Sequence, residues 1–126
     1  MKAYSFVLEW WQEASHSGSQ EDGLERAIRL CSENFREQLS VKQIASETNM
    51  SREHFTRSFT ERFKETPAAL LRRLRLAEAT TFLRDTRLPL SEVARRSGFY
   101  SLRHMMRTFQ RVYGKSPSQY RRRLSQ

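Results

Sequence analysis

The sequence has few of the residues that build loops, tight turns and covalent cross-links. Its 126 residues include one cysteine, three prolines and four glycines. The single cysteine, Cys31, excludes a disulfide within the chain and is typical of a reducing cytosol, so we expect a cytoplasmic protein. The scarcity of glycine and proline argues against a β-rich fold and against a glycine-rich phosphate-binding loop.

Long apolar runs are also lacking, and acidic residues are few. No apolar stretch approaches the roughly 20 residues of a membrane span, and the N-terminus lacks the basic region and apolar core of a secretion signal. The 14 acidic residues face 23 lysines and arginines, which gives a formal net charge of +9. This excess favours a polyanionic partner, either nucleic acid or an anionic membrane; the alternative is a role in solubility alone.

No arrangement typical of catalysis is present either. The sequence contains no nucleophile with a base and an orienting group, no metal-ligand spacing and no phosphate loop, so we expect no enzyme, metal or cofactor. His54 and His104 have no cysteine or acid at ligand spacing, and we expect packing or a backbone hydrogen bond for them. Binding to a membrane surface would need one helix with a continuous basic face, whereas the basic residues are spread over several short helices.

The second half of the chain contains one segment twice. Residues 51–74 read SREHFTRSFTERFKETPAALLRRL, and residues 101–124 read SLRHMMRTFQRVYGKSPSQYRRRL, with an offset of 50 and no gap. The pairs Ser51/Ser101, Arg57/Arg107, Phe59/Phe109 and Pro67/Pro117 are identical. A repeat of this length indicates that one small structural unit is used twice.

Apolar periodicity and capping residues predict only helices. Apolar residues recur at helical spacing over 4–14 and 23–37. Further helices are expected over about 41–48, 51–63, 67–85, 89–96 and 101–113, and from 117 to about 124. Ser40 with Gln43 fits a capping box, Ser51 and Ser101 fit N-caps, and Thr66-Pro67 and Ser116-Pro117 each open a helix. In the helix over 67–85, we expect one apolar stripe of Leu70, Leu74 and Ala77.

Each repeat has the pattern of a helix-turn-helix motif. A short helix with a small residue, Ala45 or Ala94, is followed by a tight turn and a longer Ser-capped helix. The turns contain Asn49 and Gly98, which tolerate a positive φ. At 100° per residue, one side of each longer helix is predicted to be buried; its aromatic residues are Phe55, Phe59, Phe63, Phe109 and Tyr113.

The opposite sides carry hydrogen-bonding groups near a capped N-terminus, the end that enters the major groove in this motif. Arg57 and Arg107 recur there, and arginine bound to guanine O6 and N7 is the commonest specific base contact. The alternative is a structural or phosphate-only role, such as pairing of Arg57 with Glu47. Glu53 could accept from a cytosine amino group, and His104 could reach a base or a phosphate.

Other residues are candidates for contacts with phosphates, which position the protein without reading sequence. They comprise the two capping serines, with the N–H groups at their helix starts, and several exposed basic residues. The arginines at 121–123 are either further phosphate contacts or a solvated tail. The predicted phosphate-contacting residues are Ser51, Arg52, Arg62, Lys64, Arg96, Ser101, Arg111 and Lys115.

The helix over 67–85 has a length of about 27 Å at 1.5 Å per residue. Successive major-groove faces on one side of the duplex lie about 34 Å apart. A rigid helix of this length could place both recognition helices in adjacent major grooves. We therefore expect a monomer, rather than a dimer, on an asymmetric site; bent DNA, or full docking of only one unit, is the alternative if the spacing falls short.

These segments resemble the DNA-binding domain of the AraC/XylS family of bacterial transcription regulators. The resemblance covers about 23–124 and is most specific in LPLSEVARRSGFYSLRHMMRTFQRVYGKSPSQYRRRL. It implies an all-α domain of seven helices, with two helix-turn-helix units joined by a long helix. It also implies binding to double-stranded promoter DNA, a place at the bacterial nucleoid, and activation through contact with RNA polymerase. By position, it assigns base reading to Glu53, Thr56, Arg57, Arg103, His104 and Arg107.

The chain departs from the family pattern in two places. Lys64 replaces a helix-ending glycine, and because a left-handed lysine costs about 1 kcal/mol, we expect an irregular helix end. Only about 22 residues precede the match, where many members have a sensor domain, so this is either a short member or part of a longer regulator. We divide the chain into an N-terminal helix and linker (1–22), a first helix-turn-helix unit (23–65), a linker helix (66–86) and a second unit (87–126).

The sequence supports one alternative function of a different class. The chain could be a protein-interaction module that regulates transcription by binding RNA polymerase or another regulator. Loss of DNA reading should then leave the outer faces apolar or acidic. The outward arginines argue against this alternative, while Glu53 and Met106 are compatible with it.

Overall fold

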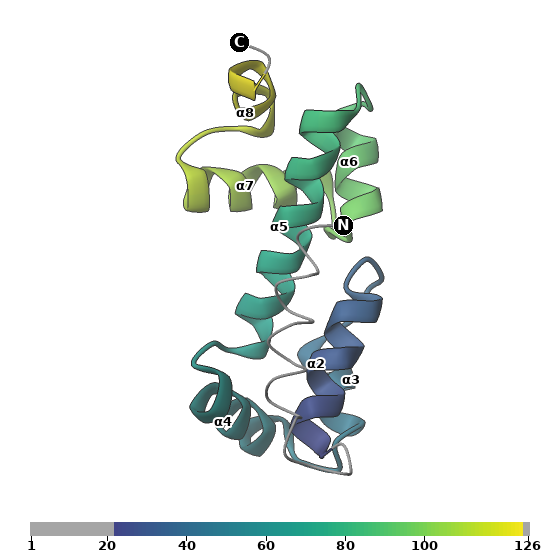
Figure 1. The fold of residues 1–126 in the computed structure, drawn as a ribbon, viewed down its shortest axis with the longest axis vertical. Coiled ribbons are helices and arrows are strands. Elements are labelled where there is room, and N and C mark those ends of the chain that lie inside the picture. Colours follow the sequence, from purple (N-terminus) through teal and green to yellow (C-terminus); the bar gives the residue numbers. More distant parts are fainter. Residues whose placement is uncertain (1–21, 125–126) are drawn as a thin grey trace. The chain divides into compact units, whose positions relative to one another are not determined.

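The computed structural model describes residues 22–124, and this part of the chain folds into helices without strands (Figure 1). The predicted all-α, seven-helix domain is therefore confirmed, whereas the helix predicted over 4–14 lies outside the described residues. The helices are α2 (Gly23–Asn34), α3 (Val41–Ser46), α4 (Arg52–Phe63), α5 (Pro67–Asp85), α6 (Leu90–Ser97), α7 (Leu102–Tyr113) and α8 (Pro117–Leu124).

The chain divides into two compact units, and the boundary falls inside α5, between Leu74 and Arg75. The first unit packs one face of α4 against α2, α3 and the beginning of α5. The rings of Phe55, Phe59 and Phe63 follow one another along α4, with centroids 5.5 Å and 4.7 Å apart. The buried apolar residues of this core are Ala27, Ile28, Cys31, Phe35, Ile44, Ala45, Phe55, Phe59, Phe63, Leu70, Leu71 and Leu74.

The second unit has a smaller core of its own. Its buried apolar residues are Leu76, Ala79, Leu83, Val93, Ala94, Phe99, Met105 and Phe109. The prediction that Tyr113 lies in the core is wrong, because its side chain is 36% exposed. The ring lies in the last turn of α7, at the rim of the core, where it contacts the rings of Phe109 and Tyr120, each at 5.2 Å. Burial of part of the ring raises the pKa of the Tyr113 hydroxyl, and the nearby Tyr120 adds to this shift.

The predicted apolar stripe of α5 is only partly correct. Leu70 and Leu74 are buried in the first core, but Ala77 is half-buried. Farther along the helix, Leu76, Ala79 and Leu83 belong to the second core instead. Because α5 contributes to two cores, no single helical stripe describes which of its residues are buried.

The helix starts confirm the predicted capping residues. Ser40 and Gln43 form a reciprocal capping box, with bonds of 3.1 Å and 2.8 Å. The Thr66 hydroxyl accepts from the N–H of Ala69 at 3.1 Å, and the Ser116 hydroxyl accepts from the N–H of Gln119 at 3.2 Å. Four boundaries differ from prediction by one to three residues: α2 ends at Asn34, α3 ends at Ser46, and α6 both begins and ends one residue later, at Leu90 and Ser97, with Pro89 as its N-cap.

Left-handed residues occupy the turns and two helix ends. Asn49 has φ 62° and Gly98 has φ 91°, as predicted for the turns of the two motifs. The expected irregular end of α4 is not found: Lys64 has φ 60°, and its N–H donates to the Thr60 carbonyl at 2.8 Å. Gly114 closes α7 in the same way, at 3.0 Å from the Gln110 carbonyl. The backbone hydrogen bond thus forms at Lys64 in spite of the strain of its conformation.

Candidate nucleic-acid interface

Helices α3 and α4 form one helix-turn-helix pair, and α6 and α7 form the other. Ala45 and Ala94 are each 2% exposed, as expected where two helices approach closely. In the first turn, the Thr48 hydroxyl donates to the Ala45 carbonyl at 2.6 Å. In the second turn, the N–H of Phe99 donates to the Ala94 carbonyl at 3.0 Å. These bonds satisfy carbonyls at the end of each short helix and set the direction in which the longer helix begins.

Serine caps fix the N-termini of the two longer helices, α4 and α7, which we call the recognition helices. The Ser51 hydroxyl accepts from the N–H of His54 at 3.1 Å, and the Ser101 hydroxyl accepts from the N–H of His104 at 3.0 Å. The N–H groups of the first two residues in each helix have no partner within the helix. They carry the positive end of the helix dipole and are suited to hold an anion such as a phosphate.

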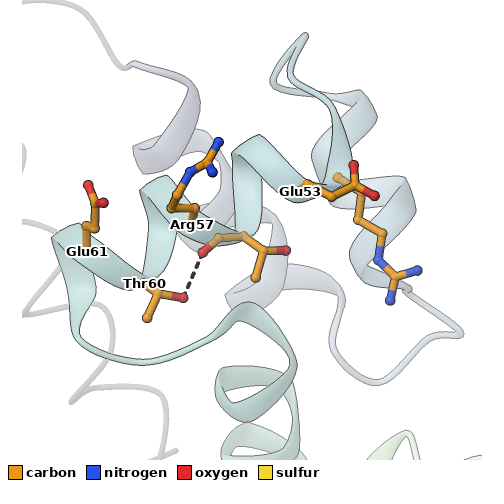
Figure 2. A pocket seen from close by; sticks show the side chains of 6 residues that line it. Glu53, Arg57, Thr60 and Glu61 are labelled. Carbon is orange, nitrogen blue, oxygen red and sulfur yellow. Dashed lines mark hydrogen bonds between the residues drawn. The ribbon is translucent and has the colours of Figure 1, made fainter.

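The outer face of α4 is polar and of mixed charge. A shallow depression follows it, lined by Arg52, Glu53, Thr56, Arg57, Thr60 and Glu61. Figure 2 shows Arg57 and Glu61 extending from neighbouring turns of α4, while the Thr60 hydroxyl donates to the Thr56 carbonyl at 2.7 Å. Within residues 22–124, the Arg57 guanidinium has no ion pair, and the alternative pairing with Glu47 is not formed. Its five donors are therefore available to an external acceptor.

The outer face of α7 is more strongly basic. Arg103, Met106, Arg107 and Gln110 are exposed on it, and α7 contains no acidic residue. Neither Arg103 nor Arg107 forms an ion pair with any residue of the described part of the chain. The two recognition helices thus share one outward arginine at the same position but differ around it.

The ring of His104 packs against Phe99, in agreement with the predicted packing role, and part of the ring is exposed. Its ring meets Phe99 edge-on at 5.6 Å. Partial burial lowers the pKa of its imidazole, and the positive charges of Arg75, Arg111 and Arg107 lower it further. The lowered pKa favours the neutral imidazole at pH 7, which can both donate and accept a hydrogen bond. His54, its counterpart in α4, is exposed.

The predicted phosphate-contacting residues fall into two groups. Arg62 is paired with Asp22 at 2.5 Å, and Arg96 is paired with Glu92 at 2.8 Å. Hydrogen bonds from Arg95 and Arg96 lower the pKa of Glu92 to about 2, so this pair is fully charged at neutral pH. The basic candidates without an ion pair among residues 22–124 are Arg52, Lys64, Arg111 and Lys115.

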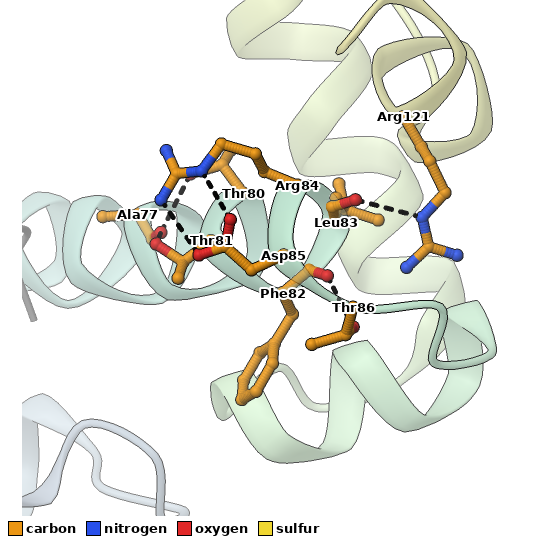
Figure 3. A network of polar contacts seen from close by, with 9 residues as sticks. All are labelled: Ala77, Thr80, Thr81, Phe82, Leu83, Arg84, Asp85, Thr86 and Arg121. Carbon is orange, nitrogen blue, oxygen red and sulfur yellow. Dashed lines mark hydrogen bonds and ion pairs between the residues drawn. The ribbon is translucent and has the colours of Figure 1, made fainter. Parts of the chain in front are cut away.

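Arg121, the first of the three arginines in the C-terminal basic run, has a structural position. Its guanidinium donates to the carbonyl of Leu83 at 3.3 Å and to that of Leu88 at 2.8 Å. Figure 3 shows it reaching from α8 to the end of α5. It therefore satisfies a carbonyl in the last turn of α5 and holds the following loop, whereas Arg122 and Arg123 are exposed.

Among residues 22–124, no three histidine, cysteine or acidic side chains lie close enough together to hold a metal ion. None of the helices described is both long enough and apolar enough to cross a membrane.

Comparison with known proteins places this architecture in a family. A family model for a helix-turn-helix domain matches residues 44–123. A regulator of the AraC type from Chromobacterium violaceum has a similar structure, with 27% identity and a TM-score of 0.69 over 82% of this chain and 93% of that one. The chain belongs to the AraC family. Residues 22–124 form an AraC-type DNA-binding domain, of the kind found in transcription regulators.

Three further proteins are similar to this chain over most of its length. The DNA-binding domain of AdpA, crystallised with a target DNA, is 31% identical with a TM-score of 0.75, over 81% of this chain and 92% of that one. The regulator MtrA of Neisseria gonorrhoeae is 29% identical over 118 residues, 94% of this chain and 36% of MtrA. The activator RclR of Escherichia coli is 33% identical over 87 residues, 69% of this chain and 31% of RclR. Matches to the first three curated relatives cover 28–42% of their length.

Met106 is an outward residue that is not among the base-reading sites predicted from the sequence. Its side chain is 43% exposed, on the same face as Arg103 and Arg107. The signal was present in the sequence, because a spacing of three residues places Met106 about 60° from Arg103 around the helix.

Proposed function

We propose that this chain binds double-stranded DNA at specific sequences and activates transcription, with α4 and α7 each lying in a major groove. The observation that carries the proposal is the shared design of the two helices. Each has a buried inner face, a serine-capped N-terminus and, as its sixth residue, an exposed arginine without an ion pair among the described residues. Its membership of the AraC family supports the same function.

In the proposed complex, contacts with phosphate come first and fix the position of each helix. The unpartnered N–H groups at the starts of α4 and α7, with Arg52, Lys64, Arg111 and Lys115, bind phosphate oxygens. Arg62 and Arg96 contribute less, because their charges already face Asp22 and Glu92. These contacts supply affinity that falls with salt concentration and does not depend on sequence.

Base edges are then read by side chains of the outer faces. Arg57 and Arg107 each bind a guanine through O6 and N7. Glu53 accepts from a cytosine amino group and repels phosphate, so it disfavours a shifted register on the DNA. Thr56, Arg103 and the neutral His104 complete the two sets of base-reading residues.

We further propose that a monomer reads two different half-sites about one helical turn apart. The outer faces support unequal half-sites, because α4 carries Glu53 and Thr56 where α7 carries Arg103 and Met106.

Activation of transcription is supported by the similarity to RclR, which is a transcriptional activator. The exposed Val112 of α7, at 48%, offers an apolar contact for a protein such as RNA polymerase.

Selection from random duplexes with the purified protein tests the proposal. We expect one enriched motif with two unlike half-sites, whose centres are separated by about 10 base pairs. A single enriched half-site would mean that only one unit reads bases. Binding without any enriched motif would reject sequence-specific reading and favour the alternative, a protein-interaction module.

Transcription in vitro from a promoter that carries the selected site tests the activator role. Val112→Ser should leave the Kd for DNA unchanged and reduce activation if this residue contacts the polymerase. Repression by the wild-type protein, or equal activation by wild type and variant, would reject the corresponding part of the proposal.

A further inference from the structure

The outer face of α7 contains one apolar side chain among its basic and polar groups. Met106 is the fifth residue of the helix, one turn after Arg103 and next to Arg107, and it is 43% exposed. Its neighbour Met105 is completely buried in the core of the second unit, so the two methionines have different roles. A single exposed apolar residue is ordinary on a protein surface, and the position of Met106 within the basic face is what gives it meaning.

The major groove offers an apolar partner at only one kind of base. Guanine, adenine and cytosine present donors and acceptors there, while thymine presents the C5-methyl group beside its O4 acceptor. An apolar side chain pressed against a donor or acceptor would leave that group without a hydrogen bond, which is costly. Against a methyl group the same side chain removes apolar surface from water and deprives no polar group of a partner.

We propose that Met106 is a specificity-determining residue that contacts the C5-methyl group of a thymine in the half-site read by α7. The inference rests on the proposed function, since it requires α7 to lie in the major groove. Methionine suits the role because its unbranched, flexible chain and polarisable sulfur adapt to an irregular apolar surface. Arg103 and Arg107 on either side hold the helix against the groove.

The recognition helix of the first unit has no exposed apolar side chain at the position of Met106. The residue that corresponds to Met106 in α4 is Thr56, which is half-buried. A threonine hydroxyl can bond to several base edges and its methyl can touch a thymine, so this position does not require one base. The requirement for thymine therefore belongs to the half-site of α7 and distinguishes it from that of α4.

The experiment removes the methyl group from the DNA and the methionine from the protein. In the selected duplex, each thymine of the α7 half-site is replaced in turn by deoxyuridine, which keeps every hydrogen-bonding group and lacks only the methyl. The Kd is measured by fluorescence anisotropy at one fixed salt concentration, for wild type and for Met106→Ala. Val112→Ala is the matched control, since Val112 is also an exposed apolar residue of α7.

We expect deoxyuridine at one position to weaken binding of the wild type and of Val112→Ala by about fourfold, the effect of losing one buried methyl-sized group. Met106→Ala should bind the thymine duplex more weakly and show no further loss with deoxyuridine. An α7 half-site without thymine, no effect of deoxyuridine on the wild type, or an equal effect in Met106→Ala would overturn the inference while leaving the proposed function intact. Failure of the proposed function is recognised separately, because no motif would then be enriched in the selection.

Discussion

The guanidinium of Arg62 donates to the carboxylate of Asp22 at 2.5 Å, which links the end of α4 to the N-cap of α2 across 40 residues of sequence. Asp22 also accepts from the N–H of Glu25 at 2.8 Å. Burial alone would raise the pKa of the Asp22 carboxyl. The bond from Glu25 and the charge and hydrogen bond of Arg62 outweigh burial, so the pKa lies below the ordinary value of 3.8.

Asp22 therefore has two separable contributions to stability. Asp22→Asn keeps a good N-cap and removes the charge, so it should lower the free energy of unfolding by about 0.2–1 kcal/mol, the range for a largely exposed ion pair. Asp22→Ala removes the cap as well and should cost about 1 kcal/mol more. Urea unfolding followed by circular dichroism measures both. Equal losses in the two variants would show that the cap contributes nothing.

The charge contribution should depend on pH with a definite sign. Because folding depresses the pKa of Asp22, its carboxylate stabilises the protein at pH values above the unfolded pKa. This contribution is lost as pH falls below about 4, through the folded pKa, when the carboxyl becomes protonated. The difference between wild type and Asp22→Asn should therefore be full at pH 6–7 and disappear in acid. A difference that grows toward low pH would contradict this account.

The left-handed helix ends predict opposite effects for a pair of matched substitutions. Lys64→Gly relieves the strain of a side chain at φ 60° and should stabilise the first unit by about 0.5–1 kcal/mol. Gly114→Ala introduces the same strain at φ 70°, where nothing within 4 Å would meet the new Cβ, and should destabilise by about 1 kcal/mol. Thermal unfolding measures both changes, and the same sign for both would contradict the interpretation.

Arg121 should matter for the stability of the second unit, unlike its neighbours in the basic run. Arg121→Ala removes two charge-assisted bonds to main-chain carbonyls and should lower the free energy of unfolding by about 2–3 kcal/mol. Arg122→Ala is the control and should change it by less than about 0.5 kcal/mol, since Arg122 is exposed. Indistinguishable unfolding curves for the two variants would show that Arg121 belongs to a solvated tail.

Salt dependence should separate the paired from the unpaired basic residues. In a plot of log K against log salt concentration, Arg111→Gln should reduce the slope by about one if Arg111 binds a phosphate. Arg62→Gln should reduce it less, because its guanidinium is already paired with Asp22. Titrations at several salt concentrations give the slopes, and a larger change for Arg62→Gln would reverse the assignment.

The features that the sequence predicted correctly depend on residues near one another along the chain. Ser51 and Ser101 cap helices through bonds to a residue three positions on. Asn49 and Gly98 have positive φ because their turns require it. Seven helices and two helix-turn-helix pairs follow from such local signals, repeated in register.

What the sequence missed depends on contacts between distant residues. The bonds of Arg121 span 33 and 38 residues, and no local pattern indicates them. The predicted apolar stripe of α5 is wrong at Ala77. A single helical stripe describes a helix that packs on one core, whereas α5 contributes residues to two cores. Tyr113 has a helical spacing typical of a core residue but lies in the last turn of α7, at the rim of the core. The base-reading roles remain predictions, because they depend on a DNA partner.

The central claim is that Arg57 and Arg107 each read one base, and selection from random duplexes with the two alanine variants tests it most directly. Arg57→Ala should relax the preference for guanine at one position, and Arg107→Ala at another, about one helical turn away, with every other position unchanged. If both variants keep the wild-type motif and only the salt dependence of binding changes, the arginines contact phosphate alone and the account is wrong.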